Sequence, residues 1–271
     1  MQNEKEFLKN YDITEYERPS VTADIVAFAI RHTDEESYRR DPDGSLCVLL
    51  IRRGGHPFKG CWALPGGFLQ PGETVEECAF RENTEETGIQ PASLMPVGVF
   101  SRPGRDPRGW IVSNAFVSIL SEVTFEKAGD DAAEAQWFNI GFDCGSDGVY
   151  RLNLQSGTTE ITALLKKRHT KFGSSGFEII DGGSLAFDHA EIIAAALSSL
   201  RSRAADFDAI FDFLPECFTL SALQRVQEII TDIAVLPANF RRKVADYVVE
   251  TDGSTSGAGH RPAKLYKRKE L

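Results

Sequence analysis

The chain has 271 residues, of which 42% are hydrophobic and 10% aromatic, enough to fill one large domain or a medium and a small one. Its formal net charge of −10 argues against a protein that coats nucleic acid over its whole surface, although a local basic patch is compatible with it. Five scattered cysteines without a CxxC pair argue against a disulfide framework or a zinc site. The sequence has neither a long apolar run nor a signal-peptide core, so we expect a cytoplasmic protein that does not enter membranes.

The first half of the chain predicts several strands and one helix. After a polar arm at residues 1–19, apolar and β-branched runs predict strands at 21–30, 46–51, 97–100, 110–120 and 135–140. The helix is expected at 73–87, between a glycine-rich lead-in and Gly88. Strands with a single internal helix predict a mixed α/β sandwich rather than a doubly wound sheet.

The second half changes character near residue 150. We expect a strand at 150–156, a basic run at 166–169 and a helix at 188–200 with Asp188 as its N-cap. Short helical segments follow, so the domain boundary is placed near residue 204. The expected organisation is an arm at 1–19, a first domain at 20–203 and a second domain at 204–271.

The predicted helix at 73–87 carries acids where apolar residues are expected. Val75 and Ala79 begin a core-facing stripe, and Glu82 and Glu86 continue it, with Glu85 beside them. Burying these carboxylates together is costly, so a hard cation such as Mg²⁺, with Mn²⁺ as the alternative, is expected to neutralise them. A solvated acidic helix face is the competing interpretation for such a pattern in isolation.

The spacing around these acids resembles the Nudix box. Gly67 is followed after five residues by Glu73, and after seven more by the Arg81-Glu82, Glu85-Glu86 and Gly88-Ile89 pairs. The resemblance implies a Nudix α/β/α sandwich that hydrolyses a nucleoside diphosphate linked to another group. It implies metal-binding and catalytic roles for the following residues: Glu82, Glu85 and Glu86, with Arg81 as the orienting arginine, Gly67 at the metal and Glu73 at the substrate.

Two further positions bear on this site. Asn83 stands where the box has an apolar residue, so it is expected to point inward, to require a partner and to bear on catalytic efficiency rather than metal binding. Glu134 lies where many members carry an extra acid, which makes it a candidate metal ligand or general base. A surface loop acid is the alternative for Glu134.

Arginines near the box are candidates for phosphate binding. Arg102, Arg105 and Arg108 lie in a turn-rich loop whose RDPRG sequence is similar to that of ADP-ribose-type members with a C-terminal extension. Arg53, just before the box, is a weaker candidate of the same kind. The alternative is a solvated basic turn.

The last 70 residues predict a winged helix-turn-helix. Thr219 is expected to cap one helix, with Leu220, Leu223 and Val226 facing inward, and Pro237 to begin the next. A hairpin with a glycine-rich tip then follows. The second helix is expected to bury Leu236, Phe240, Val244 and Tyr247. The residues expected to contact DNA are Asn239, Arg241, Arg242 and Lys243 on this helix and Arg261 and Lys264 on the wing.

Charge supports this interpretation, because residues 237–271 contain eight basic and four acidic side chains within an acidic protein. Small winged helices also serve in dimerisation or protein docking, which remains an alternative. The order of motifs is similar to that of the Nudix-related transcriptional regulators. This resemblance implies a homodimer that senses ADP-ribose or a related nucleotide and acts on double-stranded DNA.

Three hypotheses follow. The protein is a Mg²⁺-dependent hydrolase of ADP-ribose or a related diphosphate coupled to a DNA-binding winged helix, a non-catalytic ADP-ribose-sensing transcriptional regulator, or a plain Nudix hydrolase whose C-terminal domain only dimerises. The intact glutamates favour hydrolysis. Asn83 and the basic helix favour sensing, alone or in combination with hydrolysis.

Overall fold

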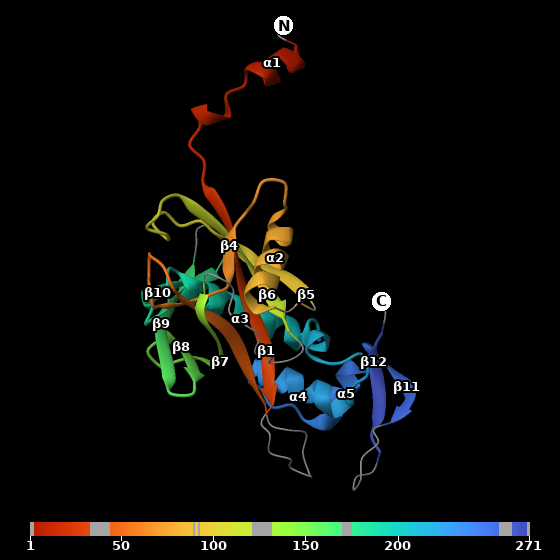
Figure 1. The fold of residues 1–271 in the computed structure, drawn as a ribbon. Helices are drawn as coiled ribbons and strands as arrows, with labels where there is room; N and C mark the ends of the chain where they lie inside the picture. The colour runs from red at the N-terminus through yellow and green to blue at the C-terminus, as the bar shows by residue number, and fades with distance from the viewer. Residues whose placement is uncertain are drawn as a thin grey trace.

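A computed structural model describes residues 3–32, 44–88, 90–91, 93–120, 132–169, 175–254 and 262–269. Ten strands of this part form one sheet in the order β10-β9-β8-β7-β2-β1-β6-β5, with β3 paired to β2 and β4 paired to β1 (Figure 1). The strands are β1 Ser20–His32, β2 Gly44–Arg53, β3 Trp62–Ala63, β4 Gly66–Phe68, β5 Ser93–Phe100, β6 Ile111–Ile119, β7 Ala132–Cys144, β8 Val149–Ser156, β9 Thr159–His169 and β10 Ser175–Asp181.

Side chains of the central strand β1 point alternately to the two faces of the sheet, and each face has its own hydrophobic core. Ile25, Ala27 and Ala29 pack with Cys78 and Ala79 of helix α2 (Val75–Thr87) on one face. The even-numbered neighbours Val26 to Ile30 join the core that includes helix α3 (His189–Ala205) on the other face. Successive side chains of a strand point to opposite faces, so one apolar run serves both helices. The expected α/β/α sandwich is confirmed.

Local sequence signals account for the limits of α2. Thr74 accepts a hydrogen bond from the Glu77 backbone N–H, and the Glu77 carboxylate accepts one from the Thr74 N–H, which forms a capping box. Gly88 ends the helix in the left-handed region, at φ 72°. The helix therefore begins two residues later than expected and ends where expected.

The expected strands in the first half are all present, but the second half differs from the prediction. The basic run 166–169 lies on β9, and β9 and β10 extend the sheet where the sequence indicated only the strand that became β8. The N-terminal arm also contains secondary structure that the sequence analysis did not predict. It contains α1 (Glu4–Asn10) and the 3₁₀ turn Ile13–Glu15, and it extends away from the sheet (Figure 1).

The C-terminal segment forms the expected helix, helix and hairpin. A 3₁₀ turn (Ile210–Phe213) leads to α4 (Leu220–Thr231), α5 (Pro237–Val244) and the antiparallel pair β11 (Val248–Ser254) and β12 (Lys264–Arg268). Thr219 caps α4 by accepting from the Ala222 N–H, as expected. Leu223, Val226, Phe240 and Val244 are buried. The prediction of burial is wrong for two residues. Leu236 precedes α5 and is 70% exposed, and Tyr247 follows α5 and is 38% exposed.

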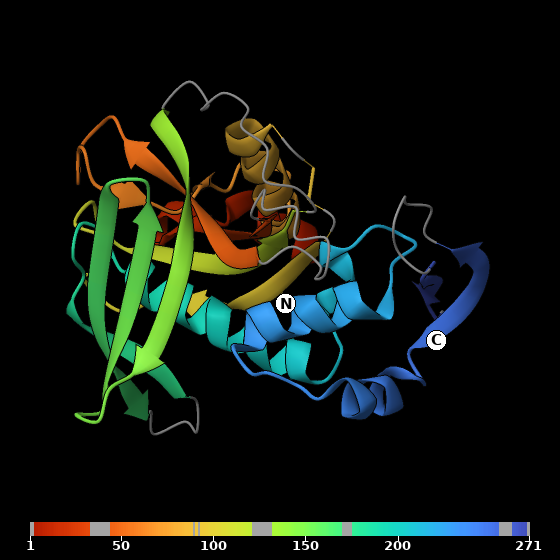
Figure 2. The same ribbon diagram turned by 90° about the horizontal axis from the view of Figure 1, so that it is seen from below.

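Helix α3 connects the sheet to this C-terminal unit. It packs beneath the sheet along its length and then against α4, which lies beside it in Figure 2. Two hydrogen bonds fix this contact, from Gln227 Nε2 to the Ala204 carbonyl (2.9 Å) and from Arg201 Nε to the Ile230 carbonyl (3.2 Å). The helix ends at Ala205, so a boundary near residue 204 falls in its last turn. None of the helices described is long and apolar enough to cross a membrane.

Candidate metal and nucleotide site

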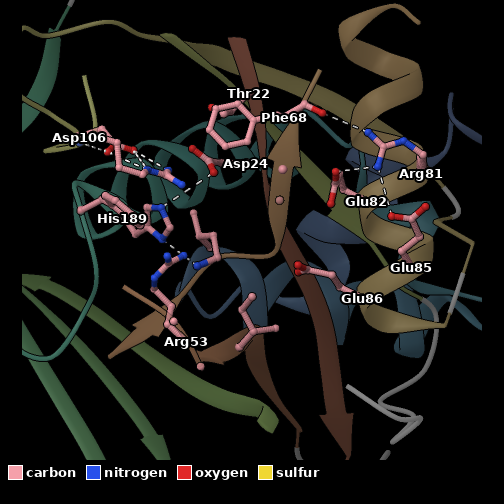
Figure 3. A pocket seen from close by; sticks show the side chains of 18 of the residues that line it. Thr22, Asp24, Arg53, Phe68, Arg81, Glu82, Glu85, Glu86, Asp106 and His189 are labelled. Atoms are coloured by element: carbon pink, nitrogen blue, oxygen red, sulfur yellow. Dashed lines mark hydrogen bonds and ion pairs between the residues drawn. The ribbon is translucent and has the colours of Figure 1, made fainter. Parts of the chain in front are cut away.

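A cavity of about 620 Å³ opens between α2, the first residues of β1 and the loops that follow β2 and β5 and precede α3. Figure 3 shows Glu82, Glu85 and Glu86 projecting toward it from α2, with Asp24, Asp106 and His189 across from them. The strand β4 lies between the two groups, because Gly66 and Gly67 pair with Asp24 and Ala23 of β1. The sheet thus brings Asp24 into the same site as Glu82 and Glu86, which are far from it in sequence.

Arg81 holds the first acidic residues of the site in place. It donates to Glu73 (2.8 Å), Glu82 (2.7 Å) and Glu85 (3.2 Å), and to the Phe68 carbonyl (3.3 Å). The hydrogen bonds that Arg81 donates to Glu73 lower the pKa of Glu73 to about 2, and the same bonds raise the pKa of Arg81. The expected pairing of Arg81 with Glu85 is confirmed, and Glu73 is a partner of Arg81 rather than part of the cavity wall.

Glu86 is the most strongly perturbed acid of the site. Burial, and then the negative charge of Glu82, raise its pKa to about 8, against one hydrogen bond from the Gly66 backbone. Its Oε2 atom is buried without a hydrogen-bond partner among the described residues. Burial also raises the pKa of Glu82. The two carboxylates thus lie in a place that disfavours their charged forms unless a cation is present.

Gly67 leaves room for the Glu82 carboxylate. A Cβ atom built on Gly67 would lie 2.1 Å from Glu82 Oε1, a distance at which atoms overlap. Glycine at this position therefore permits the carboxylate to rest against the β4 backbone, next to Gly66 and Glu86.

The donor set fits a hard divalent cation. It consists of carboxylate oxygens, one of them buried without a partner, beside a glycine backbone. Among the described residues no three such side chains already converge as a ligand group, and Glu82 and Glu85 are both paired with Arg81. A bound ion would compete with Arg81 for Glu82 and satisfy the unpaired oxygen of Glu86.

All three loop arginines already have carboxylate partners, and two of them, Arg105 and Arg108, line the main cavity. Arg105 is buried and binds both oxygens of Asp188, at 2.8 and 2.7 Å, and one oxygen of Asp24 at 3.4 Å. Arg108 lines the cavity but donates to Asp106 (2.7 Å). Both guanidinium groups are therefore largely neutralised before any ligand arrives.

The remaining two arginines differ in position. Arg102 binds Glu191 (3.1 Å) and lies beside a second cavity formed by its own loop. Arg53 lines the main cavity, donates to the Pro57 carbonyl (2.8 Å) and forms no ion pair with the carboxylates described here. Burial and the nearby charge of Arg108 lower its pKa. Sequence reasoning ranked Arg53 last, yet it is the arginine whose charge is left available to a phosphate.

Several cavity residues were missed by the sequence analysis. His189 Nδ1 accepts from the Leu64 backbone N–H (2.8 Å), and burial lowers its pKa, so its proton is on Nε2, 3.9 Å from Asp24. Asp24 also accepts from the Ser113 hydroxyl. Asp188 stands at the N-cap position of α3 but makes no capping bond, because both of its oxygens bind Arg105. The sequence analysis predicted Asp188 only as the N-cap of a helix and not as a partner of Arg105.

Asn83 is fully buried on α2, as expected for its position. Its amide donates to the Thr87 hydroxyl (3.4 Å), and that hydroxyl donates to the Asn83 carbonyl (2.6 Å). The polar residue thus has a partner one turn along the same helix.

The other expected site residues lie in three settings. Glu134 pairs through its backbone with Arg52 on β2, and its side chain is outside the described part. On α5, Asn239, Arg241, Arg242 and Lys243 are all exposed. Arg261 lies outside the described residues, and Lys264 on β12 is paired with Glu250.

Comparison with known families agrees with this architecture. The NUDIX domain family matches residues 37–141, and the NrtR DNA-binding winged helix domain matches residues 210–267. The chain is 30% identical to a solved MutT/nudix family protein from Enterococcus faecalis, with a TM-score of 0.75 and coverage of 98% of this chain and 94% of the other. It is 25% identical to Shewanella oneidensis NrtR complexed with a 27mer DNA, with a TM-score of 0.59 and coverage of 92% and 93%.

Two curated relatives extend the comparison. The ADPR responsive transcriptional repressor NtrR of Acinetobacter baylyi is 27% identical over 268 residues, which cover 98% of this chain and 88% of the relative. An ADP-ribose pyrophosphatase of Methanocaldococcus jannaschii is 54% identical over 94 residues, 34% of this chain and 54% of the relative.

Fold, site and comparisons together define a mixed α/β domain with a carboxylate-bearing helix, followed by a winged helix. The chain belongs to the MutT/Nudix family, in the arrangement that joins a Nudix domain to an NrtR-type winged helix. Nudix hydrolases use a divalent metal ion, in agreement with the donor set on α2.

The space at Gly67 yields a first prediction. In Gly67→Ala the added methyl group displaces the Glu82 carboxylate, and we expect Mn²⁺ affinity to fall at least about tenfold, the loss that a disturbed ligand environment typically causes. Titration of Mn²⁺ followed by electron paramagnetic resonance measures this. Gly55→Ala is the matched control, because Gly55 also lines the cavity but has open space around its Cβ position. Equal Mn²⁺ affinity for both variants would contradict the assignment.

Glu86 yields a second prediction, on stability in metal chelator. Its pKa is raised from 4.5 to about 8 by folding, so the native state binds more protons than the unfolded chain between these values. The stabilising contribution is complete below pH 4.5 and is lost as pH rises through about 8. We expect the urea midpoint of the protein in EDTA to fall from pH 5 to pH 9, and Glu86→Gln to remove most of this fall. An identical pH profile for the variant would show that Glu86 does not titrate in this range.

Proposed function

We propose that this chain is a Mg²⁺-dependent Nudix hydrolase of ADP-ribose or a closely related nucleoside diphosphate derivative, coupled to a DNA-binding winged helix. The observation that carries the enzymatic part is the buried carboxylate of Glu86, whose Oε2 atom has no partner among the described residues, beside Glu82 in a cavity that also contains Arg53. Support for ADP-ribose comes from the names of the two curated relatives, a responsive repressor and a pyrophosphatase.

The proposed reaction adds water across the diphosphate, so that ADP-ribose yields AMP and ribose 5-phosphate. A divalent ion held by Glu82, Glu85 and Glu86 would polarise a phosphate oxygen and lower the pKa of the attacking water. Arg81 fixes the positions of Glu82 and Glu85, and Arg53 offers its charge to the phosphate groups. His189 and Asp24 form the polar wall opposite α2.

The DNA-binding part is supported by the exposed face of α5. Arg241, Arg242 and Lys243 project from this helix, and among the described residues none of the three is in an ion pair. The apolar side chains Phe240 and Val244 hold the opposite face against the core. The solved NrtR complex with DNA, which resembles this chain over most of its length, favours the same use of this domain.

We place the protein in the cytoplasm and expect a homodimer, because regulators of this kind act on paired half-sites in DNA. The intact acids on α2 favour hydrolysis over the non-catalytic alternative. The three unpaired cations on α5 favour DNA binding over the alternative in which the C-terminal domain only dimerises.

Hydrolysis is tested by product analysis. With Mg²⁺ and ADP-ribose we expect AMP, and we expect Glu86→Gln to lower kcat/KM at least about 100-fold because an essential charge at the reacting phosphate is lost. Glu76→Gln is the matched control, since Glu76 is exposed on the same helix and lies outside the cavity lining. If the wild-type protein binds ADP-ribose but releases no AMP, the non-catalytic sensor is correct.

DNA binding is tested on a duplex taken from upstream of the protein's own gene. The double variant Arg241→Ala/Arg242→Ala should weaken binding about tenfold or more and reduce the slope of log K against log salt by up to about 2, because two phosphate contacts are lost. The control double variant Lys166→Ala/Lys167→Ala removes the same charge from β9, outside the winged helix, and should leave DNA binding nearly unchanged. Similar losses in both double variants would point to nonspecific attraction.

A further inference from the structure

The cavity contains a group of stacked side chains that metal binding and hydrolysis do not require. The guanidinium of Arg108 lies over the ring of Phe68, 5.1 Å from its centroid, and over the ring of Phe187 at 5.3 Å. Arg53 lies over the same Phe187 ring at 4.9 Å. Rings and guanidinium groups therefore alternate in the order Phe68, Arg108, Phe187 and Arg53, which we call the stacked wall.

The backbone at this wall is held in an unfavourable conformation. Phe187 has φ 52°, and Phe58, whose ring lies 4.7 Å from that of Phe187, has φ 60°. Bulky residues rarely adopt this left-handed region, and each such residue costs on the order of 1 kcal/mol or more. Two adjoining phenylalanines share this strain at one side of the cavity, a pattern that points to selection for the position of the rings rather than for stability.

Phe68 ends the stacked wall with an open face. Its side chain is 43% exposed although it lines the cavity, and Figure 3 shows its ring between the Asp106 side and Arg81. Its backbone carbonyl accepts a hydrogen bond from Arg81, the residue that holds Glu82 and Glu85. The ring is thus fixed beside the acids that are expected to hold the diphosphate.

At the Phe68 end of the stacked wall the local charge does not favour a phosphate. Arg108, which covers the inner face of the Phe68 ring, is bound by both oxygens of Asp106, at 2.7 and 3.0 Å. A guanidinium that is neutralised in this way offers a flat surface but little net charge. A planar, uncharged aromatic group is the ligand chemistry that suits an exposed phenyl ring backed by such a surface.

We propose that Phe68 forms a base-binding subsite, in which the nucleobase of the diphosphate ligand stacks on the exposed ring while Arg108 and Phe187 support that ring from behind. This inference rests on the proposed function only for the diphosphate at the carboxylates, and it adds where the base lies and what recognises it. Stacking on one ring, without hydrogen bonds to the base edges, accommodates any base. This subsite therefore favours nucleotides over inorganic diphosphates but does not discriminate among bases.

The test measures ligand binding by calorimetry in the presence of Ca²⁺, a hard divalent cation that carboxylate oxygens can hold at the site, with ADP-ribose and inorganic pyrophosphate as probes. Phe68→Ala should weaken ADP-ribose binding between about 5-fold and 150-fold, the range observed when one stacking partner of a base is truncated. Pyrophosphate affinity should change less than about twofold, because the backbone carbonyl that binds Arg81 remains. Phe80→Ala is the matched control, since Phe80 is exposed to a similar degree, 41%, and is not part of the cavity lining.

A second variant reports stacking directly. Phe68→Trp should keep ADP-ribose affinity within about threefold of the wild type and show additional quenching of tryptophan fluorescence with ADP-ribose but not with pyrophosphate. Equal affinity of Phe68→Ala and wild type for ADP-ribose, or equal loss for both probes, would overturn the subsite. So would a lack of additional quenching in Phe68→Trp.

The two proposals fail in different ways. If the wild-type protein binds another nucleoside diphosphate sugar in place of ADP-ribose, the proposed ligand is wrong, and the same variants with that ligand decide the subsite. If it binds pyrophosphate but no base-containing diphosphate more tightly, the subsite is overturned and the diphosphate site stands.

Discussion

Arg81 holds together a set of acids that would otherwise repel one another. It binds Glu73, Glu82 and Glu85 and the carbonyl of Phe68, so the carboxylate helix and strand β4 are joined through one guanidinium. Glu86 is left out of this arrangement, and its burial beside Glu82 raises its pKa. Without a metal ion these surroundings favour its protonated form, and a bound cation would compete with that proton.

On the side of the cavity opposite α2, arginines are held by acidic side chains. Asp188 and Asp106 neutralise Arg105 and Arg108, and these ion pairs form part of the cavity wall. Arg53 retains its charge among the described residues, and Phe68 retains an open face. The cavity thus offers one cationic and one aromatic surface opposite a carboxylate helix, a combination that matches a diphosphate attached to a base.

Sequence patterns predicted much of this protein because the relevant signals are local. The strand runs, the cap at Thr219, the stop at Gly88 and the acids of α2 lie within short segments whose signals can be followed directly. The pairing of Arg105 with Asp188 joins residues 83 positions apart, and no local pattern reveals it. Strands β9 and β10 were missed because charged residues interrupt their apolar alternation, and Leu236 was misplaced because the helix begins one residue after it.

Helix α3 has a mechanical consequence. Its first residues, next to Asp188, form part of the cavity wall, and its last turn is bonded to α4 through Ala204 and Gln227. Seventeen residues at 1.5 Å each make a rod of about 25 Å that cannot shorten without breaking its own hydrogen bonds. One continuous helix therefore joins the Asp188–Arg105 ion pair beside the cavity to the C-terminal helices.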